Sequence, residues 1–167
     1  MTINSIGNDY IKIESTGEIT YPLQPAFFSY LAADKSNVTG NGTVYTIPFD
    51  TESFDRNSDF NTGTGVFVAP VTGIYHLSAS VRFKSGSNKT TGYCFIYNST
   101  ATATIASQLR AFNTTSTNDM SINIAGNFSL TAGDNIVVRC QVNGSGSDDA
   151  DILSTSSYTY FCGYLVA

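Results

Sequence analysis

Charged residues are scarce in this chain of 167 residues. Asp, Glu, Lys and Arg make up 13% of it, and thirteen acidic against eight basic residues give a net charge of −5. Proteins that bind a phosphate backbone normally carry a basic patch or stripe. We therefore expect no nucleic-acid partner.

Long apolar runs are missing as well. No stretch approaches the roughly 18 apolar residues that indicate a membrane-spanning helix. The N-terminus, MTINSIGNDYIKIESTG, lacks a basic region followed by an apolar one, which is the pattern of a secretion signal. We expect no membrane insertion and no signal peptide in the chain as given.

Motifs of catalysis are also lacking. The only histidine is His76, and the chain contains no G-x-S-x-G elbow, no H-E-x-x-H and no phosphate-binding glycine loop. A hydrolytic triad around His76 remains an alternative without a supporting motif. Cys94, Cys140 and Cys162 form no C-x-x-C, and because their number is odd they cannot all pair within one chain. We expect buried free thiols and no enzymatic activity.

What the chain does contain is typical of β-structure. Its length fits one domain with a core of its own plus a short appendage. Aromatic residues reach 13%, and Thr, Ser, Asn and Gly fill much of the rest, a composition that favours strands separated by turns. Amphipathic helical patterns are scarcely present, so we predict an all-β sandwich or barrel.

The clearest strand pattern lies between Gly65 and Phe83. From Tyr75 to Phe83 apolar residues alternate with polar ones, which puts one set on a buried face. Just before, Pro70 fixes its own φ and Gly73 permits a backbone turn that a residue with a Cβ would resist. This segment predicts a strand, a turn and a second strand.

Further strands are predicted along the chain. The first is a small hairpin, Tyr10–Ile13 and Glu18–Tyr21, which ends at the stiff joint around Pro22 and Pro25. We place a boundary there, with an N-terminal hairpin or stem lead-in at 1–25 and a head domain at 26–167. The strands expected in the head, besides the pair around Pro70, are 26–32, 43–49, 92–97, 103–112, 120–130, 135–142 and 158–166.

The last predicted strand has two apolar faces. Tyr158, Tyr160, Cys162 and Tyr164 alternate with a second set that begins at Phe161. An outer face of this kind needs a cover, and a symmetric copy of the same chain supplies one. We therefore expect an oligomer.

Four segments in order resemble the globular head of complement C1q and the wider tumour necrosis factor-like superfamily. The run 59–75, DFNTGTGVFVAPVTGIY, is similar to the family signature of an aromatic followed by T-G-x-F-x-A-P-x-x-G-x-Y. AFFSY at 26–30 resembles its first strand, LTAGDNIVV at 130–138 its L-x-x-G-D-x-V turn and strand, and YFCGYL at 160–165 its closing strand. The resemblance covers about residues 26–167.

This resemblance implies a ten-stranded antiparallel jelly-roll β-sandwich that assembles as a homotrimer, with the first and last strands near the three-fold axis. The implied axis or core residues are Phe28, Tyr30, Tyr160, Phe161 and Tyr164. The implied fold-motif residues are Phe67, Pro70, Gly73, Tyr75, Gly133, Asp134 and Gly163.

The family also suggests a metal and a ligand surface. Some members bind calcium near the trimer apex, so Asp148, Asp149, Asp151 and Asp134 are candidate calcium ligands, although an acidic loop is usually just solvated. The Ser-, Gly- and Asn-rich loops at 143–151 and 84–92 are long enough to contact a ligand, or they are mobile connectors.

The segment before the head decides between functions. It has no G-x-y repeat of a collagen stalk, and STGEITYPLQPAF resembles the lead-in to such heads in phage tail-fibre proteins. The sequence thus favours a non-enzymatic trimeric module in a virion or tail fibre that binds a host surface glycan or protein. The alternatives are a secreted C1q-like recognition protein or lectin, located outside the cell, and a purely structural trimerisation cap.

Overall fold

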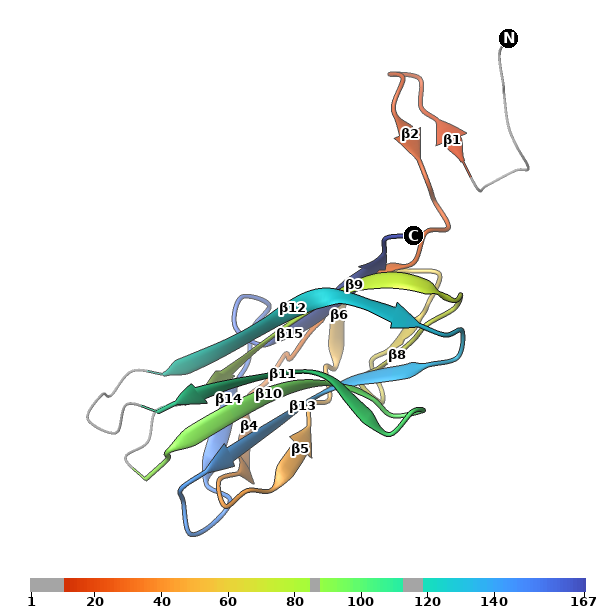
Figure 1. The fold of residues 1–167 in the computed structure, drawn as a ribbon. Coiled ribbons are helices and arrows are strands. Elements are labelled where there is room, and N and C mark those ends of the chain that lie inside the picture. The colour runs from red at the N-terminus through yellow and green to blue at the C-terminus, as the bar shows by residue number, and fades with distance from the viewer. Residues whose placement is uncertain (1–10, 85–87, 113–118) are drawn as a thin grey trace.

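The computed structural model describes residues 11–84, 88–112 and 119–167. They form two antiparallel sheets packed face to face, with a separate two-stranded hairpin at the N-terminal end (Figure 1). No helix is assigned in these residues. The hairpin is β1 (Lys12–Ile13) and β2 (Ile19–Thr20), and the sandwich strands are β3 (Ala26–Tyr30), β4 (Lys35–Thr39), β5 (Val44–Thr46), β6 (Thr51–Arg56), β7 (Phe60–Asn61), β8 (Val66–Val68), β9 (Gly73–Phe83), β10 (Thr91–Asn98), β11 (Ala103–Ala111), β12 (Met120–Leu130), β13 (Asn135–Asn143), β14 (Ala150–Leu153) and β15 (Tyr160–Leu165).

Each sheet is built around one long strand. In the β9 sheet the order is β4-β14-β9-β15-β3-β6, and β12 pairs with the other edge of β9. In the β13 sheet the order is β11-β10-β13-β8-β7, and β5 also pairs with β13. The first and last strands of the head, β3 and β15, are therefore neighbours, as the resemblance implied.

Aromatic side chains fill much of the space between the sheets. Phe27 stacks on Phe67 with ring centroids 4.6 Å apart, and Phe161 meets Phe27 edge-on at 5.0 Å. All three are at most 1% exposed. Burying large apolar side chains is the main favourable term in folding, so this cluster holds the two sheets together.

The predicted strand, turn and strand around Pro70 are confirmed as β8 and β9. Pro70 lies in the exposed turn, and the ring of Tyr75 packs against Phe67 with its hydroxyl donating to the Val71 carbonyl at 2.8 Å. Our reason for Gly73 was wrong. Its φ is outside the left-handed region, but a Cβ there would come within 2.6 Å of the Ala167 carbonyl oxygen. Close approach of the chain end, and not a turn, requires glycine here.

The expected second turn is present at Gly133 and Asp134. Gly133 has a φ of +89°, which disfavours a residue with a Cβ. The Asp134 carboxylate accepts a hydrogen bond from the Thr131 amide at 2.9 Å and closes the turn. Gly163 is buried on β15, where a Cβ would lie 2.6 Å from a Leu77 methyl group.

Some strands of the sandwich were not predicted. They are β4, β6, β7 and β14, which add short segments to the ten-stranded pattern. The predicted N-terminal hairpin is present with shorter strands, β1 and β2, and Tyr10 lies outside the described residues. Pro22 and Pro25 lie between this hairpin and β3.

Candidate functional site

The outward face of β3 and β15 carries four of the five residues implied to lie at the axis or in the core. Phe28, Tyr30, Tyr160 and Tyr164 lie on this side, and their strands pair so that Tyr160 is opposite Tyr30 and Tyr164 opposite Ala26. The fifth, Phe161, points the other way and is completely buried between the sheets. The two-faced pattern of the last strand is thus confirmed from Tyr160 on, whereas Tyr158 lies in the turn before β15. We call this surface the β3–β15 face.

Aromatic contacts make the β3–β15 face nearly continuous. Phe28 stacks on Tyr160 with centroids 5.3 Å apart and lies 6.4 Å from Phe54 of β6. Tyr164 lies 5.2 Å from the His76 ring. Phe54 and Tyr164 are 51% and 49% exposed. Large apolar surface of this kind on one face of a sheet marks a protein interface.

The polar groups of this face have partners beside the rings. The Nδ1 atom of His76 lies 2.9 Å from the side-chain oxygen of Asn127. The structure therefore gives this ring an amide partner and not the partners of a catalytic triad. Cys162 is half-buried, and burial raises the pKa of its thiol against the opposing effect of the Ser78 hydrogen bond. Cys94 and Cys140 are fully buried, as expected of free thiols.

A second row of aromatic side chains lies on the outward face of the β13 sheet. Tyr93, Phe95 and Tyr97 alternate with buried residues along β10 and are all half-buried. The rings of Tyr93 and Phe95 are parallel within 9° at 5.6 Å, and the Arg139 guanidinium lies 3.5 Å above the centre of the Tyr97 ring. Strand pairing places Gln141 beside Tyr93. We call Tyr93, Phe95 and Tyr97 the β10 row.

The candidate calcium ligands do not share one site. Asp134 and Asp148–Asp151 lie beyond opposite ends of β13, which at nine residues spans roughly 30 Å. In the loop, Asp149 and Asp151 approach Lys89 and Lys84 at 3.6 and 3.5 Å. Among the residues that the structure covers, no three His, Cys, Asp or Glu side chains gather in a way that could hold a metal. Calcium binding stays a prediction.

The acidic loop is nevertheless well connected. Asp148 accepts a hydrogen bond from the Asn41 amide and Asp151 one from the Asn37 amide. These contacts join 143–151 to β4 and the segment after it, at the end of the head away from the N-terminal hairpin (Figure 1). Of the other expected contact loop, 84–92, residues 85–87 lie outside the described residues.

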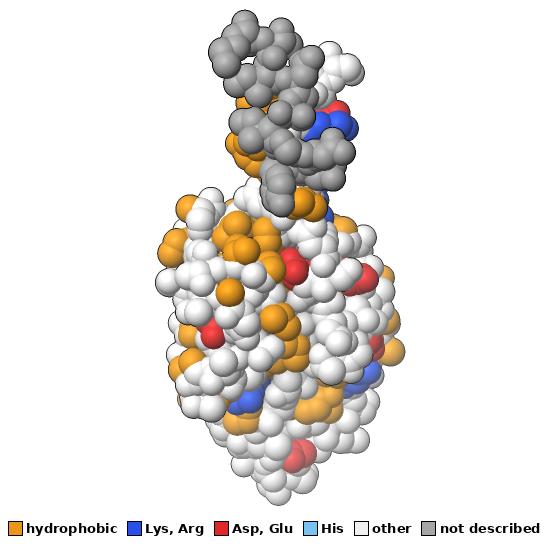
Figure 2. All heavy atoms as spheres, turned by 90° about the vertical axis from the view of Figure 1, so that its right-hand side faces the viewer, with side chains coloured by type: hydrophobic (Ala, Val, Ile, Leu, Met, Phe, Trp, Pro, Cys, Tyr) orange, Lys and Arg blue, Asp and Glu red, His pale blue; other side chains and the backbone are white. Residues whose placement is uncertain are grey.

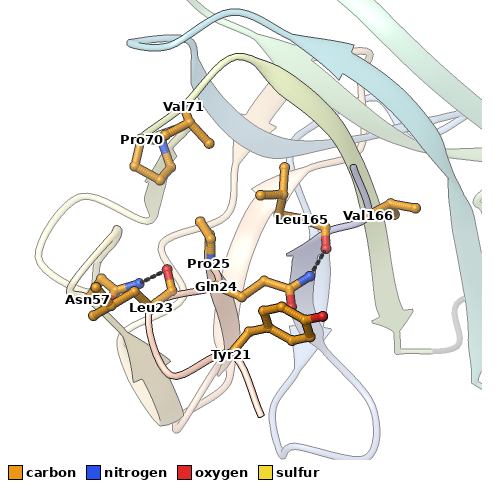
Figure 3. A pocket seen from close by; sticks show the side chains of 9 residues that line it. All are labelled: Tyr21, Leu23, Gln24, Pro25, Asn57, Pro70, Val71, Leu165 and Val166. Carbon is orange, nitrogen blue, oxygen red and sulfur yellow. Dashed lines mark hydrogen bonds between the residues drawn. The ribbon is translucent and has the colours of Figure 1, made fainter. Parts of the chain in front are cut away.

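A pocket of about 750 Å³ lies where the hairpin joins the head (Figure 3). It is mostly apolar, and two hydrogen bonds cross its floor: Asn57 donates to the Leu23 carbonyl at 2.9 Å, and Gln24 donates to the Leu165 carbonyl. Its lining residues are Tyr21, Leu23, Gln24, Pro25, Asn57, Pro70, Val71, Leu165 and Val166.

Sequence reasoning missed three parts of these surfaces. Phe54 was hidden because the β6 segment TESFDR reads as polar. The β10 row could have been found, because Tyr93, Phe95 and Tyr97 occur at every second position of a predicted strand. The pocket has no signal in the sequence, since residues 165–166 of its wall are more than 90 residues from its other lining segments.

The model of the C1q domain family matches residues 26–166, which include both sheets. The chain belongs to the C1q domain family. Domains of this family are typically trimeric recognition modules without enzymatic activity. The hairpin lies before the matched span.

Solved structures agree on the fold. Murine APRIL at pH 5.0 is similar with a TM-score of 0.63 and 16% identity over 86% of this chain and 99% of that one. The globular domain of zebrafish complement 1qA has a TM-score of 0.59 and 16% identity, over 86% and 98% of the two chains. Eiger TNF from S. frugiperda has a TM-score of 0.57 and 14% identity, over 87% and 92%.

At these identities the structures establish a shared C1q and tumour necrosis factor-like sandwich and nothing finer. No curated protein sequence matches the chain significantly. In the described part of the chain there is no helix long and apolar enough to cross a membrane.

Proposed function

We propose that this C1q-family chain is a homotrimeric recognition head that acts outside the cell or on a virion, without enzymatic activity. The observation that carries the proposal is the β3–β15 face. It exposes half of Phe54 and Tyr164 beside a stacked pair of rings. Three copies that cover this face for one another would remove this surface from water.

Charge substitution tests the assembly. Tyr164→Glu places a carboxylate on the β3–β15 face, where an assembled neighbour would strip it of water and leave it unpaired. We expect a trimer for the parent protein and a folded monomer for the variant, measured by light scattering and circular dichroism. Thr104→Glu, on the exposed edge of the other sheet, is the matched control. An unchanged trimer in Tyr164→Glu would contradict this use of the face.

For recognition we propose the β10 row and a glycan ligand. The faces of aromatic rings carry negative charge density, which suits the weakly positive C–H groups of a sugar ring. Arg139, beside the rings, supplies N–H donors for hydroxyl groups. Tyr, Phe and Arg are also the residue types enriched where proteins bind partners.

A binding assay tests this surface. The trimeric parent protein is applied to a glycan array and to host cells with and without enzymatic removal of surface polysaccharide. We expect binding that is lost in Tyr93→Ala and in deglycosylated cells, and retained in Ser107→Ala, which lies on the same face opposite Phe95. Binding that survives deglycosylation and falls to protease treatment would replace the glycan by a protein ligand.

The place of the head in a larger particle follows from its lead-in. The resemblance of residues 15–27 to phage tail-fibre lead-ins supports a position at the tip of a virion fibre. A secreted lectin-like protein and a structural cap are the alternatives. Absence of binding to any host envelope component in a stable trimer would favour the cap.

A further inference from the structure

The N-terminal hairpin has one polar and one apolar face. Ile13 is directly opposite Ile19, and Lys12 is directly opposite Thr20. Because side chains alternate along a strand, the two isoleucines share one face and Lys12 and Thr20 share the other. Ile11 and Tyr21 lie just outside the two strands, at the next positions of the same alternation, and both are exposed. We call Ile11, Ile13, Ile19 and Tyr21 the hairpin apolar face.

The polar face is satisfied within the hairpin. Lys12 pairs with Glu14 at 2.9 Å, and Thr20 donates to the same carboxylate at 3.3 Å. The Glu14 amide donates to the Glu18 carbonyl at 2.8 Å, and Gly17 adopts a φ of +101° in the turn between them. These contacts define the hairpin and its register.

The apolar face is uncovered. Ile13 and Ile19 are 57% and 59% exposed, and Tyr21 and Ile11 are 49% and 38% exposed. A two-stranded hairpin is at best marginally stable alone in water, and further strands or packing of its apolar face stabilise such a unit. A hairpin of this composition therefore requires a partner for that face.

Its own head does not provide that partner. Beyond Tyr21 the chain is fixed to the head: Arg56 donates to the Tyr21 carbonyl at 3.4 Å, Asn57 donates to the Leu23 carbonyl, and the Leu165 amide donates to the Pro25 carbonyl at 3.0 Å. Held in this way, the hairpin projects from one end of the head, next to the C-terminus (Figures 1 and 2). Among the described residues, none of these contacts covers the hairpin apolar face.

Apolar surface leads from the hairpin toward the β3–β15 face. Tyr21 belongs to both the hairpin apolar face and the pocket wall, and the same wall includes Leu165 and Val166. Val166 is two residues beyond Tyr164 of the β3–β15 face, and the two side chains are 47% and 49% exposed. Figure 2 shows hydrophobic side chains exposed at the end of the head that adjoins the hairpin. A partner that covers the β3–β15 face is thus positioned to reach the hairpin.

We propose that the hairpins of three copies pack their apolar faces against one another and form a β-stem on the three-fold axis beneath the heads. The inference rests on the proposed trimer. The occupant of each hairpin apolar face is the same face of the other two copies, and the polar faces with the Lys12–Glu14 pairs point outward. The stem registers three chains before the heads begin.

Cross-linking of the full chain tests the stem. In a Cys162→Ser background, which removes the half-buried native thiol, Ile13→Cys is treated with a short bifunctional maleimide and compared with Lys12→Cys from the opposite face. We expect chain-to-chain cross-links for Ile13→Cys at least tenfold above those of Lys12→Cys, at a yield that does not change on dilution. The background protein alone controls for Cys94 and Cys140.

Because a cysteine substitution can itself alter packing, the cross-linking is accompanied by a measurement of thermal unfolding. The double variant Ile13→Ser/Ile19→Ser should lower the midpoint of thermal unfolding by about 4 °C or more, whereas Lys12→Ser/Thr20→Ser should leave it within about 1 °C. A trimeric mass with equal cross-linking at positions 12 and 13 would overturn the stem and leave the proposed trimer standing. A monomeric mass would overturn both.

Discussion

Gly163 lies where β15 approaches β9 most closely. Its backbone angles suit any residue, but a Cβ would meet a Leu77 methyl group at 2.6 Å and the His76 carbonyl oxygen at 2.9 Å. Inserting a methyl group into a packed core forces neighbours to shift, which costs about 1–3 kcal/mol. We expect Gly163→Ala to lower the free energy of unfolding by that amount in urea titrations. Gly146→Ala, where a Cβ meets nothing within 4 Å, should stay within about 0.5 kcal/mol of the parent.

Asp59 links stability to pH. Burial, and secondarily the nearby Asp55 carboxylate, raise its pKa to about 6, and its Oδ2 is buried without a hydrogen-bond partner among the described residues. The folded protein therefore binds this proton more tightly than the unfolded chain, whose Asp pKa is about 3.9. The contribution of Asp59 to stability is complete below about pH 4 and is lost as the pH rises through 6.

Asp59→Asn should remove this dependence, since the amide cannot ionise. Relative to the parent, the variant should gain stability between pH 4.5 and pH 7.5, measured as the shift of urea midpoints. Asp34→Asn is the opposite case. The Ser154 amide donates to Asp34 at 2.7 Å and lowers the pKa of that carboxyl, so its substitution should cost stability at neutral pH and not at low pH. Parallel pH profiles for the parent and both variants would contradict these assignments.

At the scale of an element, the two faces of β15 have different roles. One packs in the core of the sandwich, and the other faces the neighbouring copies of the proposed trimer. Phe161 is fully buried and touches Phe27, Phe49 and Phe60, whereas its neighbour Tyr160 faces outward. Phe161→Ala should lower the free energy of unfolding by about 3–5 kcal/mol. Tyr160→Ser should leave the circular dichroism of the folded sandwich unchanged and weaken only the trimer. Equal losses of fold in both variants would contradict this division.

The same element shows what a sequence can predict. Alternation along β15 and β12 identified their buried faces, because each strand has one side in the core: β15 lies between β3 and β9, and β12 lies beside β9. Alternation failed for β6, which is mostly exposed and is defined by its pairing with β3, more than 20 residues earlier. The need for glycine at position 73 was equally non-local, because the residue that a Cβ would meet there is Ala167.

At the scale of the whole molecule, the two sheets have different outward faces. The β9 sheet presents the β3–β15 face, and the β13 sheet presents the β10 row. The β3–β15 face could be predicted because both faces of β15 are apolar, and an apolar outer face requires a cover. The β10 row could be found in the sequence as alternating aromatic residues, but only the fold shows that it lies on the other sheet. Self-association and recognition can therefore use separate surfaces of one head.

The mass of the protein in solution is the most direct test of this account. The chain has a mass of 17.9 kDa, and multi-angle light scattering at micromolar concentration measures the assembly without reference to shape. If copies cover the β3–β15 face for one another, the measured mass is three times that of one chain. A stable monomer, with the exposed Tyr164 and Phe54 left in water, would contradict it.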